Sequence, residues 1–313
     1  TPTLAMLVER AGQISNFQKE KYFNVELDCD GIPAVKSKIF DPDEAEQLRS
    51  RCQGSEAIVT AVKEAEKKVK APKLYDLTTL QREANRIYGM TAKQTLDTAQ
   101  SLYEKKLITY PRTDSQYLTE DMEQTARNVV RQIYEKYQLT GPFDQPEQPD
   151  VKKVMNNSKV TDHHAIIPTM ELTSCHMDEL KSWEEKILFL IAVHTVMAMS
   201  KDHIYQETEI EVECQGEVFK TKGKTVLQDG WKIFENCFKN KDRMAIADPD
   251  QEMKERIPKV TKGQTFYAVA AEKTEHFTSP PKPYSEDTLL AAMETAGNKE
   301  FDEDTEKKGL GTP

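Results

Sequence analysis

The sequence predicts a multidomain protein of mixed α and β structure, in which a discontinuous β-domain carries a helical insertion. Residues 21–72 and 200–275 contain runs that alternate apolar and polar side chains, which is the period of half-buried strands. Residues 73–199 instead repeat apolar side chains every three or four positions, which is the period of helices. We therefore interpret the two strand-rich stretches as halves of one β-domain, an arch that carries the insertion.

The two ends of the chain predict incomplete parts of a further helical region. Residues 1–20 begin with Thr1-Pro2 and continue as a helix, since proline is tolerated in the first helical turn. Residues 276–313 run from a proline-rich turn into a helix at residues 286–296. The chain starts without an initiator Met and stops after G-L-G-T-P. We expect that both ends are cut from something longer.

Composition narrows the class of protein. Charged residues make up 31% of the chain and hydrophobic residues 37%, which is typical of a soluble, helix-rich globular protein. No apolar run approaches the roughly 20 residues that span a bilayer, so we expect no membrane partner and a cytoplasmic location, nucleoid-associated if the source is bacterial. The five cysteines form no CxxC pair and indicate neither a zinc site nor a disulfide framework. The net charge of −10 disfavours tight duplex binding, but a basic groove can lie on an acidic body.

The first half of the β-domain has clear strand and turn signals. Residues 22–29 place every second side chain on one apolar face, and Asp30-Gly31 predicts a tight turn into a second strand at residues 34–40. Residues 41–52 predict a helix with Asp41 as its cap, and residues 57–69 predict a third strand with a lysine-rich exit.

The second half repeats this pattern. Residues 205–214 alternate apolar side chains with glutamates, and Gln215-Gly216 predicts a turn into a strand at residues 218–227. A last strand is predicted at residues 265–271. These strands are interpreted as completing the sheet begun by the first half.

The insertion opens with two predicted helices. T-T-L-Q at residues 78–81 and T-A-K-Q at residues 91–94 both match a capping box, and Gly89 lies in the turn between the helices. A predicted strand at residues 107–110 follows, which favours a winged-helix-like unit, with a simple αα-hairpin as the alternative. The other predicted helices cover residues 119–137 and residues 178–199, the latter apolar on nearly all sides and therefore central.

The strongest chemical signal lies in residues 104–115, E-K-K-L-I-T-Y-P-R-T-D-S. Tyr110 follows an apolar pair, Pro111 fixes the chain just after it, and Arg112 stands two residues further on. A phenol can act as a covalent nucleophile, and a planar guanidinium can hold two phosphate oxygens at once. These residues suit attack on a phosphodiester, although an ordinary turn with a buried Tyr and a surface Arg would look similar.

This segment resembles the active-site segment of the type IA DNA topoisomerases, and we suspect the topoisomerase III branch. Further segments are similar to the family and occur in its order: the first helix T-P-T-L-A-M-L-V-E-R, L-x-x-L-Q-R-E-A at residues 77–84 and H-x-A-I-x-P at residues 163–168. The last are P-P-K-P-Y-S-E-D-T-L-L and G-L-G-T-P near the chain end. Pro283 departs from the family pattern, which has a basic residue there, and this weakens the case for a DNA contact at that position.

The resemblance implies an activity and roles for particular residues. The expected enzyme cleaves one DNA strand through a 5′-phosphotyrosine on Tyr110, passes a strand and reseals the break without ATP. Arg112 would neutralise charge on the phosphate, and His163 would donate a hydrogen bond to a phosphate oxygen. The same resemblance assigns DNA contacts to Thr113, Asp114, His164, Ser285 and Thr312.

The resemblance also implies that part of the active site is missing. In the family, Mg²⁺ is held by carboxylates of an N-terminal Toprim domain, and no Asp-x-Asp cluster on a strand end occurs before residue 22 of this chain. We therefore expect no metal ligands here, a Toprim domain of the same polypeptide as partner, and locally unpaired or single-stranded DNA as substrate. Residues 1–313 alone are expected to be inactive.

Two alternatives remain at this stage. The chain could be a non-catalytic module that binds single-stranded DNA, which is what the absent Toprim domain would make of it in practice. A relaxase-type nuclease is the other alternative, but such enzymes pair metal-binding histidines one residue apart. His163 and His164 are adjacent, and neighbouring side chains of an extended segment point to opposite faces, so they cannot easily share a metal. For His164, a purely structural role stays open.

Overall fold

Strands from both stretches flanking the insertion meet in one sheet. The computed structural model describes residues 1–139, 149–235 and 258–296. Within them, a seven-stranded sheet has the order β6-β3-β4-β5-β2-β1-β7, and every neighbouring pair is antiparallel. The strands are β1 (Lys21–Cys29), β2 (Ile32–Ile39), β3 (Ala57–Val69), β4 (His203–Cys214), β5 (Glu217–Gln228), β6 (Thr265–Phe266) and β7 (Ala270–Phe277).

The hairpin of β1 and β2 forms where the sequence predicts it. Asp30 and Gly31 both have positive φ values, 55° and 85°, and this backbone matches the twist of the strands that it connects. Helix α2 (Pro42–Cys52) begins after Asp41, whose carboxylate accepts the backbone N–H of Asp43 at 2.8 Å. The predicted cap and first position of this helix are confirmed. Buried apolar side chains from the hairpin and from α2 share one core: Phe23, Val25, Leu27, Cys29, Ala34, Ala45, Leu48 and Cys52.

The single strand predicted at residues 265–271 is wrong, because the chain divides there into two strands on opposite edges of the sheet. β6 pairs with β3, whereas β7 pairs with β1. Ala268 between them has a φ of 52°, a left-handed conformation that a continuous strand does not contain. Val269 is buried, and its backbone exchanges hydrogen bonds with Gly54 and Ser55 after α2. These bonds hold the chain where it crosses between the two edges.

The first two helices of the insertion form as predicted, except for one cap. Helix α3 (Leu77–Tyr88) is capped by Asp76, whose carboxylate accepts the Thr79 N–H at 2.7 Å, so the capping box predicted at residues 78–81 is wrong. Helix α4 (Ala92–Glu104) does use the predicted box, since Gln94 N–H donates to Thr91 Oγ1 at 3.1 Å. The chain turns between the helices at Gly89, which has a φ of 67°.

Helix α6 (Ser182–Ala198) is the centre of the insertion, as its all-round apolar sequence predicts. Most of its residues are buried, but it begins later than predicted, because residues 177–179 form a separate 3₁₀ turn. The other elements are α1 (Pro2–Ser15), α5 (Glu123–Tyr137), α8 (Glu286–Glu294), and the 3₁₀ turns Glu120–Met122, Val151–Val154, Asn157–Lys159, Met170–Leu172, Met177–Glu179 and Gly230–Phe234.

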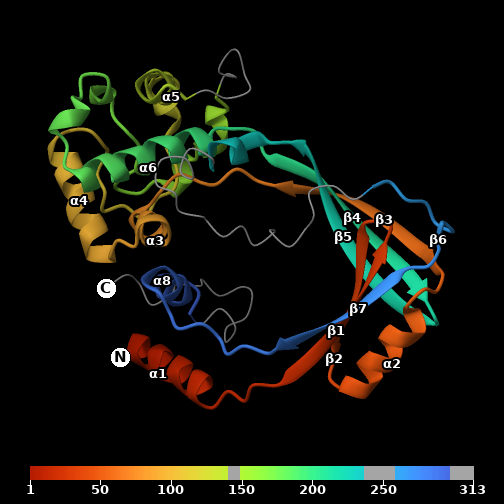
Figure 1. Ribbon diagram of the computed structural model, residues 1–313. Helices are drawn as coiled ribbons and strands as arrows, with labels where there is room; N and C mark the ends of the chain where they lie inside the picture. The colour runs from red at the N-terminus through yellow and green to blue at the C-terminus, as the bar shows by residue number, and fades with distance from the viewer. Residues whose placement is uncertain (140–148, 236–257, 297–313) are drawn as a thin grey trace.

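Two groups of helices extend from the sheet towards the same side (Figure 1). We call the group formed by α3, α4, α5 and α6 the helical arm, and the group formed by α1 and α8 the terminal arm. At the ends of the arms, furthest from the sheet, α8 lies next to α3 (Figure 1), and Arg82 of α3 forms an ion pair with Asp287 of α8. In the described part of the chain, no helix is both long and apolar enough to cross a bilayer.

A buried carboxylate fixes the end of α4 against the start of α6. Glu184 lies 2.6 Å from Lys105 Nζ and 2.7 Å from Ser101 Oγ, and it accepts the backbone N–H of Lys181 at 2.9 Å. Burial opposes the charge of Glu184, but the hydrogen bonds from Lys105, Ser101 and Lys181 outweigh it and lower the carboxyl pKa to about 2. Lys105 thereby anchors the chain just before the segment that carries Tyr110.

We expect Glu184→Gln to lower the free energy of unfolding by about 1.5–3 kcal/mol at neutral pH, because it removes charge-assisted hydrogen bonds. Since the folded-state pKa is depressed, this stabilisation is present above the ordinary carboxyl value of about 4.5 and is lost as the pH falls towards about 2. Urea titrations at pH 7 and pH 3 measure both effects. Glu104→Gln, at an exposed position, is the control. If Glu184→Gln lowers the free energy of unfolding equally at pH 7 and pH 3, then the charge of Glu184 is not the source of the stabilisation.

Candidate active site

Tyr110 lies in a loop that follows α4, and the strand predicted at residues 107–110 is wrong. Among the described residues, the only β-type pairing of this segment is an isolated antiparallel bridge between Ile108 and Pro168. The pairing stops on both sides of this bridge, because the Ile167 N–H donates to the Thr109 hydroxyl and the Leu107 N–H donates to the Leu102 carbonyl. A continuous ladder therefore cannot form. The winged-helix-like interpretation is not confirmed.

The Tyr110 ring is held between two aromatic neighbours. Its centroid lies 4.3 Å from that of His163, and 5.3 Å from that of Tyr103, which meets it edge to face. Tyr110 is half-buried, whereas His163 is exposed. The structure thus brings together two residues that are 53 positions apart in the sequence and that both have predicted catalytic roles.

Two threonines join the loop that carries Tyr110 to the loop that carries His163. The Thr113 hydroxyl donates to the His163 carbonyl at 3.0 Å and accepts the Ser115 N–H at 3.1 Å. The Thr109 hydroxyl donates to the Ala165 carbonyl at 2.9 Å and accepts the Ile167 N–H at 3.0 Å. Because each hydroxyl serves as donor and acceptor, both loops are fixed relative to each other on either side of Tyr110.

Arg112 is exposed, between the buried residues Pro111 and Thr113. Among the residues that the structure describes, none forms a hydrogen bond or ion pair with its guanidinium. The rigid backbone around Pro111 and Thr113 limits the positions of Arg112, while its five N–H donors stay available. A guanidinium two residues from a phenol, with its donors available, can bind a phosphate group.

The residues assigned to DNA contacts differ in their surroundings. Asp114 is exposed. The pKa of the Asp76 carboxyl, which caps α3, is raised mainly because that carboxyl is buried, and the nearby charge of Asp114 raises it further. His164 is half-buried, with Nδ1 2.9 Å from the Ala165 carbonyl, so Nδ1 carries the proton and donates. Ser285 caps α8 by accepting the Thr288 N–H at 3.2 Å. Thr312 lies outside the described residues. Asp114 and His164, like Thr113, belong to the two loops that meet at Tyr110.

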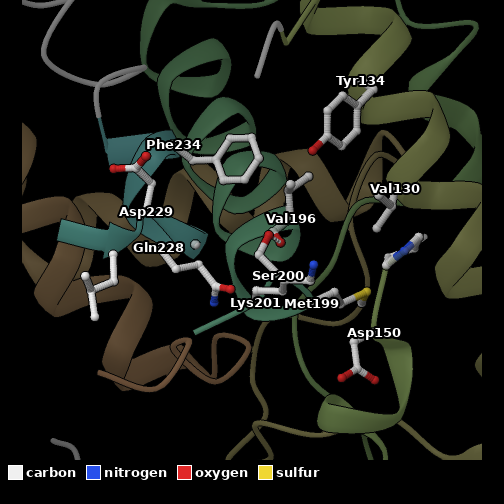
Figure 2. A pocket seen from close by; sticks show the side chains of 13 residues that line it. Val130, Tyr134, Asp150, Val196, Met199, Ser200, Lys201, Gln228, Asp229 and Phe234 are labelled. Carbon is white, nitrogen blue, oxygen red and sulfur yellow. Dashed lines mark hydrogen bonds between the residues drawn. The ribbon is translucent and has the colours of Figure 1, made fainter. Parts of the chain in front are cut away.

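A separate pocket of about 350 Å³ lies between α5, α6 and the end of β5 (Figure 2). Its wall includes Tyr134, Val196, Asp229 and Phe234 (Figure 2), and none of the predicted site residues lines it. The described residues also contain no group of three or more His, Cys, Asp or Glu side chains placed to hold a metal ion. The chemistry available near Tyr110 is therefore that of a phenol, a guanidinium and an imidazole.

Comparisons with known proteins agree with this site. The family described as DNA topoisomerase matches residues 1–313, the whole chain. The chain belongs to the type IA DNA topoisomerase family. It is 36% identical over 310 residues to DNA topoisomerase 3 of Bacillus licheniformis and 36% identical over 306 residues to DNA topoisomerase 3 of Bacillus subtilis. Each comparison covers 94% of this chain but 41% of the relative, so the chain spans about two fifths of their length.

A solved topoisomerase supports the same fold. The structure of full-length topoisomerase I from Thermotoga maritima matches with a TM-score of 0.69 and 25% sequence identity, over 94% of this chain and 47% of that one. The curled antiparallel sheet and the helices that accompany it are thus those of a type IA topoisomerase, and the similarity to the two Bacillus topoisomerases makes this chain topoisomerase III-like.

Sequence patterns alone missed the residues that position the site. The sequence patterns indicate no role for Tyr103 or Thr109, and they do not indicate that Thr113 bonds to the loop of His163. Thr109 and Thr113 nevertheless stand on either side of Tyr110 in I-T-Y-P-R-T-D-S. Threonines inside a short, proline-containing loop are a usable signal, because their hydroxyls commonly bond backbone groups there.

We expect Thr113→Val to destabilise the folded chain by about 1–3 kcal/mol, since a partly buried carbonyl and a buried N–H lose their partner. Thr113→Ser keeps the hydroxyl and should recover most of the loss. Thermal unfolding measures both, with Thr98→Val on the surface of α4 as the matched control. A Thr113→Val protein as stable as the control would show that the loops are held by other contacts.

Proposed function

We propose that this chain supplies the nucleophile of a topoisomerase that cleaves one DNA strand through a 5′-phosphotyrosine intermediate, passes a strand and reseals the break without ATP. The observation that supports it is the contact of Tyr110 with His163, two residues before Arg112, whose guanidinium has no partner among the described residues. The family membership of the chain supports DNA as the substrate. It also leaves the relaxase-type alternative without support.

The chemistry follows from these three side chains. The phenol oxygen of Tyr110 attacks phosphorus, the bond from phosphorus to the 3′ oxygen breaks, and the tyrosyl ester retains the energy of the broken bond. Arg112 holds two non-bridging oxygens and neutralises the charge that develops on them. His163 donates a hydrogen bond to the same phosphate, which its exposed position against the Tyr110 ring permits. Attack by the 3′ hydroxyl on the ester reverses the reaction.

Two further requirements belong to a Toprim domain in this proposal. The phenol must lose its proton and the departing 3′ oxygen must gain one, since an alkoxide is a poor leaving group. Magnesium would help to hold the DNA phosphates, but the described residues around Tyr110 do not form a metal-binding set, so no step is assigned to it here. The Bacillus relatives, which are more than twice as long, have room for such a domain.

The test is the formation of a covalent adduct. Residues 1–313 alone, mixed with a labelled single-stranded oligonucleotide, should bind it weakly and with strong salt dependence and form no denaturant-resistant adduct, with or without magnesium. This weak binding is the second candidate function, that of a single-strand-binding module, and the free Arg112 favours it. Adding a Toprim domain in trans should produce an adduct that maps to Tyr110. A magnesium-dependent adduct from residues 1–313 alone would overturn this division of roles.

A further inference from the structure

Lys106 has a backbone conformation that rarely suits a lysine. Its φ is 61°, in the left-handed region, and it follows Lys105 at the end of α4. The Lys106 N–H donates to the Tyr103 carbonyl at 2.8 Å, and the Leu107 N–H donates to the Leu102 carbonyl at 2.9 Å. These two bonds form the pattern that ends a helix at a left-handed residue, which is usually glycine and sometimes asparagine. A lysine there is unfavourable, because its Cβ crowds the backbone.

The loops of the candidate site hold Lys106 in this conformation. The Thr169 N–H donates to the Leu107 carbonyl at 3.0 Å, and the Thr169 hydroxyl donates to the Lys106 carbonyl. Thr169 directly follows the H-x-A-I-x-P motif. On the other side, the Lys106 N–H is bonded to Tyr103, whose ring contacts that of Tyr110. The backbone of Lys106 is therefore fixed to both loops of the site.

The side chain of Lys106 has no partner in the described part of the chain. It is exposed, and no hydrogen bond or ion pair joins its ammonium to a described residue. Its neighbour Lys105 differs, because that ammonium lies 2.6 Å from the buried carboxylate of Glu184. The two adjacent lysines thus have separate roles. Lys105 fixes the fold, whereas Lys106 presents an unpaired positive charge where the loop of Tyr110 begins.

A structural role for the charge of Lys106 would lie at the end of α4. The helix dipole favours a positive charge near the last turn of a helix. Lys105, one position earlier, already supplies such a charge, and a glycine at position 106 would remove the conformational cost. The helix end therefore does not require lysine at position 106. Unfavourable backbone conformations are concentrated at functional sites, where the side chain has another use.

We propose that Lys106 is a positioning residue that binds a backbone phosphate of the DNA strand, other than the phosphate that Tyr110 attacks. An ammonium is a point charge that binds phosphate without a fixed geometry, which suits a contact that only holds the strand. The planar group of Arg112 suits the phosphate that reacts. A contact of Lys106 with the backbone adds affinity but no sequence preference. The choice of DNA as the ligand rests on the proposed function.

The test measures how the whole chain binds oligo(dT) of about 15 nucleotides over a range of salt concentrations. Lys106→Asn removes the charge but keeps a residue that accepts the left-handed conformation. The loss of one phosphate contact should weaken binding about fivefold at about 0.1 M salt, and it should reduce the slope of log affinity against log salt concentration by about 0.7. Lys106→Arg keeps the charge and should restore the parent affinity and slope.

Lys38→Asn is the matched control. Lys38 of β2 is also exposed, it has a φ of 62°, and its ammonium has no hydrogen bond or ion pair among the described residues. Lys38→Asn thus removes the same charge from the same backbone conformation, but in the sheet instead of beside the loop of Tyr110. It should leave the affinity and the slope at the parent values. Neither Asn variant should lower the melting temperature.

Amine labelling tests the same contact in the parent protein. Oligo(dT) should protect Lys106 from acetylation by an N-hydroxysuccinimide ester and leave the acetylation of Lys38 unchanged, as measured by mass spectrometry of peptides. Equal acetylation of Lys106 with and without oligo(dT) would overturn the proposal. So would parent-like affinity and slope for Lys106→Asn, with or without a lower melting temperature. No covalent step is involved, so a failure to form the adduct on Tyr110 leaves this test unaffected.

Discussion

Tyr110→Phe, in a protein that joins these residues to a Toprim domain, is expected to abolish cleavage and relaxation of DNA. The phenol oxygen forms the covalent bond to phosphorus, and no other group can replace it at that position. The ring remains, with its contacts to His163 and Tyr103, so the affinity for single-stranded DNA should stay within about threefold of the parent value. Adduct formation on a labelled oligonucleotide and relaxation of supercoiled plasmid measure the loss.

Tyr103→Phe is the matched control for this experiment. It removes a hydroxyl from the ring that contacts Tyr110 edge to face and leaves the packing intact. Cleavage by Tyr103→Phe should stay near the parent rate. If Tyr110→Phe still relaxes plasmid DNA, or if the adduct of the parent protein maps to another residue, then Tyr110 is not the nucleophile.

Arg112→Lys is expected to slow cleavage by about one to three orders of magnitude, or about 1.4–4 kcal/mol of transition-state stabilisation. An ammonium group keeps the charge but cannot form the two parallel hydrogen bonds that a guanidinium makes to a phosphate. Arg112 makes no hydrogen bond or ion pair within the described structure, so its replacement by lysine removes no such contact. The free energy of unfolding should therefore stay unchanged while the cleavage rate falls.

Single-turnover cleavage rates and thermal unfolding together test this second prediction. Arg49→Lys on α2 is the control, since Arg49 is paired with Glu46 on the same helix. Near-parent cleavage by Arg112→Lys would show that Arg112 acts as a point charge or lies outside the reacting groups. If the free energy of unfolding falls by as much as the transition-state stabilisation, the role of Arg112 is structural instead.

Much of the fold was predictable from local patterns. The strands β1 to β5 follow the alternation of apolar and polar side chains, and the turns at Asp30-Gly31 and Gln215-Gly216 follow from residues that accept positive φ values. Helix α6 follows from its all-round apolar sequence. The two strand errors occurred where a distant partner decides the conformation. Thr109 diverts a hydrogen bond that a strand would need, and the backbone of Val269 bonds to the loop after α2.

The candidate site was predictable in its members but not in its assembly. The motif around Tyr110 and the H-x-A-I-x-P motif named the nucleophile, Arg112 and His163 by resemblance. Nothing in either motif states that the two rings touch or that the two loops are joined. Both facts depend on hydrogen bonds from Thr109 and Thr113 to a loop about 50 residues away.

By itself, the sequence determined most of the strands, most helix starts and the family resemblance, because each of these depends on residues close together along the chain. The tertiary structure decided which loops meet at Tyr110 and which helix lies on Arg82. It also decided that β6 and β7 take opposite edges of the sheet. These arrangements depend on the packing and hydrogen bonding of residues far apart in the chain, which local periodicity does not encode.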